Sequence, residues 1–186
     1  MPDPSDLKSD HIMIASFKDD KLKEGSFTQL VRKYQERLYW HIRRMVIEHE
    51  DTNDILQNVF IKVWKNLASF RGESNLYTWL YRISTNEALT WIEQKKKRVS
   101  ISLSDNEDIF ADRLIAQKDF DPKKIEWKLQ QAVLSLPEKQ RIVFNLRYYD
   151  ELPYEEMAEV LSTSAGALKA SYHHAVKKVE AFLKGN

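Results

Sequence analysis

The C-terminal part of the chain, residues 135–183, is the feature that most constrains the fold. The segment YEEMAEVL at residues 154–161 is separated from a long basic helical stretch beginning at Ala165 by only three residues, STS. Two helices joined by about three residues are the sequence form of a helix-turn-helix, whose second helix enters the major groove of duplex DNA. Apolar residues at helical spacing pair the two helices: Met157, Ala158, Leu161, Leu168 and Ala175. An ordinary antiparallel helical hairpin is the alternative interpretation.

Composition favours helices and excludes several classes of protein. The 186 residues include only 4 glycines and 5 prolines, and Lys, Glu, Leu, Gln and Ala are frequent. The absence of cysteine excludes disulfide scaffolds, thiolate zinc sites and cysteine nucleophiles. The first residues lack the pattern of a signal peptide. No run approaches the roughly 20 apolar residues of a membrane span. We therefore expect a cytoplasmic, all-α protein.

Charge is segregated along the chain although the net charge is only +1. Residues 77–98 are basic towards their end, whereas residues 104–121 are rich in Asp and Glu. Such segregation indicates several different partners rather than one uniformly basic face. We predict four segments: an N-terminal extension (1–25), a first helical domain (26–98), an acidic linker (99–122) and a second helical domain (123–186).

Local signals predict where the helices begin. Ser26 with Gln29, and Ser135 with Glu138, have the spacing of capping boxes, which predicts helices from near residues 27 and 137. Residues 51–54, DTND, supply caps and a negative first turn before an apolar stripe that ends at Leu67. A further helix should begin near Leu76.

Aromatic and cationic residues alternate between residues 70 and 98. The polar loop RGESN at residues 71–75 precedes a helix with Tyr77, Trp79 and Trp91 and then a basic run. Rings that stack on bases, next to cations that meet phosphates, suit single-stranded DNA. For individual residues a core position is the stronger interpretation, because Trp79 shares a helical face with Leu80, and Trp64 lies in an apolar stripe.

These motifs resemble a known family, the extracytoplasmic-function (ECF) sigma factors of bacterial RNA polymerase, which belong to the sigma-70 family and contain only its second and fourth domains. The resemblance rests on DTNDILQNVFIKVW and FRGESNLYTWLYRISTNEAL in the first domain. In the second domain it rests on LPEKQRIVFNLRYYDELPYEEMAEVL and STSAGALKASYHHAVKKVEAFL. It implies an alternative sigma factor that directs promoter-specific transcription initiation and makes or breaks no bond itself.

The resemblance also implies roles for individual residues. The surface that docks on the β′ coiled coil of core polymerase corresponds to Asp54, Gln57, Asn58 and Phe60. Contacts with the −10 element and the melted strand, including capture of a flipped base, correspond to Phe70, Arg71, Ser74, Asn75, Tyr77, Arg82, Asn86, Lys95, Lys96, Lys97 and Arg98. Contacts with the −35 element correspond to Ser164, Lys169, Ala170, His173, His174 and Lys177.

In two places the chain departs from the family pattern. Ser171 and His174 replace frequent arginines in the recognition helix, and neutral histidine cannot make the bidentate contact by which arginine reads guanine. Promoter preference therefore does not transfer from relatives. Ser162 stands where such turns often have glycine, so this residue either uses another turn geometry or tolerates strain.

The partners implied are core RNA polymerase (β′ coiled coil and β), promoter DNA as duplex and melted strand, and an anti-sigma factor that can hold the protein at the membrane. We expect no cofactor, metal or small-molecule substrate. A metal site at HEDTND, residues 49–54, with His41 nearby is disfavoured, because two histidines two turns apart on one helix do not share a metal simply. The stronger alternative is a helix-turn-helix repressor or a helical adaptor that does not engage core polymerase.

Overall fold

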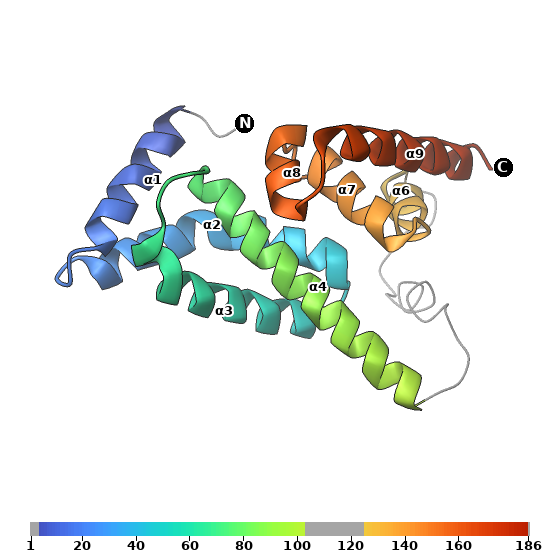
Figure 1. Ribbon diagram of the computed structural model, residues 1–186. Helices are drawn as coiled ribbons and strands as arrows, with labels where there is room; N and C mark the ends of the chain where they lie inside the picture. Colours follow the sequence, from blue (N-terminus) through green and yellow to red (C-terminus); the bar gives the residue numbers. More distant parts are fainter. Residues whose placement is uncertain (1–3, 103–124, 186) are drawn as a thin grey trace. The chain divides into compact units, whose positions relative to one another are not determined.

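The computed structural model describes residues 4–102 and 125–185, and every regular element in those ranges is a helix (Figure 1). Two compact units are present. The N-terminal unit contains α1 (Pro4–Phe17), α2 (Lys23–Val46), α3 (His49–Asn66), the 3-10 turn η1 (Leu67–Ser69) and, as far as Lys95, α4 (Leu76–Ser102). The C-terminal unit contains α6 (Ile125–Leu134), α7 (Glu138–Tyr148), α8 (Tyr154–Leu161) and α9 (Ala165–Lys184). The all-α prediction is confirmed. Most of the predicted linker lies outside the described residues, and residues 99–102 continue α4.

Apolar residues four apart build the core of the N-terminal unit. On α2 these residues are Leu30, Tyr34, Leu38 and Ile42, each at most 1 % exposed. The stripe predicted on α3 is buried at Ile55, Val59, Val63 and Leu67. Burying one such aliphatic side chain stabilises a fold by about 1.5–3 kcal/mol. The packing of these stripes, more than local propensity, therefore holds the helices in place.

The segment predicted as an N-terminal extension packs on the first domain. In α1 the buried Asp10 carboxylate accepts hydrogen bonds from the Tyr34 hydroxyl at 2.6 Å and the Lys33 ammonium at 2.9 Å. The predicted capping box at Ser26 is wrong, because α2 begins at Lys23 and Ser26 lies inside it. The Ser26 hydroxyl donates instead to the Met13 carbonyl of α1 at 2.5 Å.

A strained turn separates α2 from α3. Ile47 has φ +72°, a left-handed conformation that is unusual for a β-branched residue. The following helix begins at His49, earlier than the DTND segment predicts, and its first turn is negative as expected through Glu50 and Asp51. His41 and His49 consequently lie on different helices, contrary to the prediction that they share one.

A small apolar core organises the C-terminal unit. Phe144 of α7 packs with Val133 and Leu136 and with Ala175 and Val179 of α9. The helix predicted near residue 137 begins at Glu138, but the predicted capping box is wrong. The Ser135 hydroxyl donates to the Ala132 carbonyl at 2.7 Å. None of the helices in the described parts of the chain is long and apolar enough to cross a membrane.

The helix-turn-helix forms as the sequence predicts. Met157 of α8 and Leu168 and Ala175 of α9 are buried. Ser164 caps α9, its hydroxyl accepting the amide hydrogen of Ala167 at 3.3 Å. Ser162 has φ +50°, so the turn keeps a strained backbone at this residue and does not use another turn geometry.

Candidate nucleic-acid interface

The loop between η1 and α4 is shaped by one glycine and presents charged side chains to solvent. Gly72 has φ +75°, the left-handed region in which glycine carries no steric penalty. The Arg71 guanidinium and the Glu73 carboxylate lie 3.9 Å apart, and both side chains are more than 80 % exposed. Salt and solvent weaken such a pair strongly, so Arg71 can turn to another anion at little cost.

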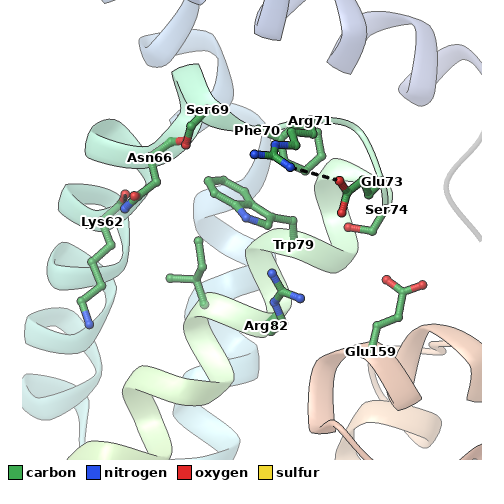
Figure 2. Close-up of a pocket in the computed structure, with 11 residues that line it drawn as sticks. Lys62, Asn66, Ser69, Phe70, Arg71, Glu73, Ser74, Trp79, Arg82 and Glu159 are labelled. Atoms are coloured by element: carbon green, nitrogen blue, oxygen red, sulfur yellow. Dashed lines mark hydrogen bonds and ion pairs between the residues drawn. The ribbon is translucent and has the colours of Figure 1, made fainter.

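Beneath this loop the N-terminal unit has a surface hollow (Figure 2). The rings of Phe70 and Trp79 line it and form an aromatic floor, and their centroids lie 5.2 Å apart. Its cationic side chains are Lys62, Arg71 and Arg82. The unit's other lining residues are Asn66, Ser69, Glu73, Ser74 and Ile83. Trp79 is half-buried, so it is partly core, as predicted, and partly the floor of this hollow.

Several residues of this hollow were not among the predicted contacts. Lys62 and Asn66 had no sequence signal, because they come from α3, far along the chain from the loop. Lys62 forms an ion pair with Glu87 of α4. The predicted Asn75 is exposed and does not line the hollow. Its carbonyl accepts the Trp79 amide hydrogen at 3.0 Å and so starts α4.

Along α4 the predicted contact residues divide by exposure. Arg82 and Asn86 are exposed and four residues apart, so they share one face of the helix. Tyr77 is only 8 % exposed, and its ring centroid lies 4.3 Å from that of Tyr81. The ring of Tyr77 therefore packs mainly in the core, and its contact with DNA stays a prediction.

The residues of the basic run at 95–98 also differ in exposure. Lys96, Lys97 and Arg98 are exposed. Lys95 is only 24 % exposed and makes two ion pairs within the N-terminal unit, each at 3.0 Å, with Glu48 and Asp51. Lys95 is therefore held by two carboxylates in this conformation, and its contact with DNA stays a prediction.

The predicted polymerase-binding residues lie on α3. Asp54, Gln57 and Asn58 are exposed, and spacings of three and four residues place them on one face. Phe60 is half-buried, with its ring centroid 6.3 Å from that of Phe27. The apolar residue that continues the exposed face is Ile61, which is 45 % exposed. The signal for Ile61 was available, because it follows Asp54 by seven residues and Gln57 by four.

The recognition helix α9 has one buried and one exposed face. Leu168, Ala175 and Val179 are buried. The exposed residues include the predicted contacts Lys169, Ala170, His173, His174 and Lys177. Lys169 also lies 5.5 Å from the ring centre of Tyr154 on α8, a cation–π contact that holds the side chain near the helix start. Among the described residues no group of three His, Cys, Asp or Glu side chains could hold a metal ion.

One helical domain with an exposed polar face and a hollow with an aromatic floor, and a second domain with a helix-turn-helix, are typical of a protein that binds nucleic acid at more than one site. Family comparison specifies it further. Residues 30–98 match the family model of sigma-70 region 2, and residues 126–179 match that of sigma-70 region 4.

Individual relatives agree with these matches. The chain is 32 % identical over 167 residues to the RNA polymerase sigma-H factor of Pseudomonas aeruginosa, covering 86 % of each chain. It is 31 % identical over 177 residues to the ECF RNA polymerase sigma-E factor of Haemophilus influenzae, covering 87 % of this chain and 90 % of that one.

Two solved structures share the fold. One is the sigma factor RpoE of Bartonella quintana in complex with the anti-sigma factor NepR, with a TM-score of 0.68 and 21 % identity over 86 % of this chain and 98 % of that one. The other is CnrH in complex with the cytosolic domain of CnrY, with a TM-score of 0.68 and 23 % identity over 96 % and 99 %. The protein belongs to the sigma-70 family and is an ECF sigma factor of RNA polymerase, which directs promoter-specific transcription initiation.

Proposed function

We propose that three surfaces of this sigma factor bind three different partners. The α3 face of Asp54, Gln57, Asn58 and Ile61 docks on core polymerase at the β′ coiled coil. The hollow under the Gly72 loop captures an unpaired base of the −10 element. The exposed face of α9 enters the major groove at the −35 element.

The hollow is the observation that carries this proposal. Extruding a base from the duplex costs a few kcal/mol and requires stacking partners and hydrogen-bonding groups at the new position. Phe70 and Trp79 offer the stacking surface, and Ser74 and Asn66 line the same hollow with groups that can bond a base edge. Lys62, Arg71 and Arg82 provide positive charge for the adjoining phosphates.

The protein itself needs no catalytic group for this role, and we propose that it is not an enzyme. Polymerase carries out the phosphoryl transfer, while the sigma factor contributes binding energy that favours the melted promoter. We further propose a cytoplasmic location and regulation by an anti-sigma factor that covers exposed surfaces of the N-terminal unit. An anti-sigma factor anchored in the membrane would hold the protein there.

Retention of genomic DNA fragments with and without core polymerase tests this proposal against a repressor. The full chain, immobilised through a terminal tag, is mixed with fragments in the presence or absence of core enzyme. We expect one defined set of fragments to be retained only when core enzyme is present. Retention of the same fragments by the protein alone would instead support a conventional repressor.

A further inference from the structure

Lys95 belongs by sequence to a run of four cations but differs from the others in its surroundings. Its ammonium lies 3.0 Å from the Glu48 carboxylate and 3.0 Å from the Asp51 carboxylate. It also lies 4.3 Å from the ring centre of Trp91, one turn earlier on α4. These contacts join α4 to the beginning of α3. We call Lys95, Glu48 and Asp51 the acidic clasp.

The backbone that presents the clasp is strained. Glu48 is the N-cap residue of α3 and directly follows Ile47, whose φ of +72° is costly for a β-branched side chain. The Thr52 hydroxyl donates to the Glu48 carbonyl at 2.6 Å and helps to fix this turn. Strain that persists in a folded protein is often found where a specific geometry matters.

The folded surroundings of the clasp disfavour the charged form of Asp51. Burial raises the pKa of Asp51, outweighing the opposing hydrogen bond and charge of Lys95, while the neighbouring Glu48 raises it further. A carboxylate whose pKa is raised is destabilised in its charged form by its folded surroundings. The place of Lys95 in the basic run, together with its two ion pairs, suggests a role for the clasp in DNA binding.

The two carboxylates neutralise a cation of the DNA-binding run. Lys96, Lys97 and Arg98 are exposed, whereas Lys95 is three-quarters covered and held by two anions. We propose that Glu48 and Asp51 are positioning residues that keep Lys95 away from nucleic acid in the unbound protein. The run therefore engages single-stranded DNA without Lys95 until the clasp opens. This inference rests on the proposed role of residues 95–98 in binding the melted strand.

The test measures how single-stranded DNA binding depends on salt. The full chain binds a labelled mixed-sequence oligonucleotide of about 15 nucleotides, within the range that one binding groove covers, and fluorescence anisotropy is followed over a salt series. Releasing one lysine onto a phosphate steepens the slope of log K against log salt by about 0.7. We expect E48Q/D51N to show this steeper slope and, at 0.1 M salt, about fivefold tighter binding.

Controls separate the clasp from general charge effects. E36Q/E50Q removes two exposed carboxylates of the same unit, neither of them in the clasp, and should leave the slope unchanged. Adding K95M to E48Q/D51N should restore the wild-type slope, and K95M alone should change it little. Circular dichroism melting shows whether each variant is folded, and the single variants E48Q and D51N serve if the double variant is not.

Two results would overturn the clasp inference, and a third would overturn the proposed role of the run. If K95M alone flattened the slope by about 0.7, Lys95 would already contact DNA and the clasp inference would be wrong. An unchanged slope in folded E48Q/D51N would also overturn it. If neutralising Lys96, Lys97 and Arg98 together left binding unchanged, the proposed role of the run would fail, whatever the clasp does.

Discussion

The rings of Phe70 and Trp79 lie 5.2 Å apart between centroids, with their planes tilted by 53°. Phe70 ends the 3-10 turn and Trp79 lies in the first turns of α4, so this contact fixes the loop between them over the hollow (Figure 2). The pair gives the proposed base-capture site an aromatic floor whose position depends on two elements of secondary structure rather than on the loop alone.

Replacing Trp79 by leucine should weaken binding of the melted strand more than replacing it by phenylalanine. A stacked base contributes about 1–3 kcal/mol, so W79L should lose roughly tenfold to hundredfold in affinity for single-stranded promoter DNA in the holoenzyme. W79F keeps a ring and should lose less. Equal losses in the two folded variants, measured by fluorescence anisotropy, would show that Trp79 acts only through packing.

Ile61 should be an anchor for core polymerase. I61S removes the exposed apolar side chain of the α3 face, and we expect affinity for core enzyme to fall by about tenfold, in the range of an apolar anchor at an interface. I12S is the matched control, because Ile12 is 60 % exposed on α1. Biolayer interferometry with immobilised core polymerase compares the two. Similar losses in both would argue against a specific α3 surface.

Gly72 should be required because of its backbone conformation, and not because a side chain would lack space at this position. Nothing lies within 4 Å of a Cβ built on Gly72, so G72A adds only backbone strain at φ +75°. That strain is about 1–2 kcal/mol. Gly25 is the contrast, because it is helical with similar open space, and G25A should stabilise the protein by about 1 kcal/mol. Urea unfolding measures both, and destabilisation by G25A would contradict the argument.

Asp51 should make the protein less stable as pH rises. Its pKa is raised above 3.8 in the folded protein, mainly by burial, so the folded state binds its proton more tightly than the unfolded state. The stability associated with the protonated form is present at pH values below 3.8 and is lost as pH rises through the higher folded pKa. Relative to wild type, D51N should therefore gain stability between pH 3.8 and neutrality. A constant difference in the free energy of unfolding across that range would contradict the prediction.

The buried stripes could be predicted from the sequence because helical periodicity is local. Ile55, Val59 and Val63 recur every four residues, and that spacing alone places them on one buried face. The capping predictions failed for a tertiary reason. The hydroxyl of Ser26 finds a carbonyl in the preceding helix, a partner 13 residues away that no local pattern indicates.

The site residues likewise include some that a local pattern predicts and some that only tertiary packing determines. Exposure of Asp54, Gln57 and Asn58 follows from the α3 stripe, because they lie opposite its buried side. The burial of Tyr77 has a local signal too, because Tyr81, Ala88 and Ile92 continue its side of α4 at helical spacing. The pairing of Lys95 does not follow from any local pattern. Lys95 pairs with Glu48 at a separation of 47 residues, so only the packing of α4 across the start of α3 determines that Lys95 is covered.

The most direct test of the central claim is run-off transcription with core RNA polymerase, with and without this protein, on a pool of genomic promoter fragments. Our account predicts defined transcripts that appear only when the protein is present and that disappear with W79L. Their start sites would also identify the −10 and −35 sequences. If folded protein and competent core enzyme bind each other but no fragment yields a transcript that depends on the protein, the account of promoter-specific initiation would be contradicted.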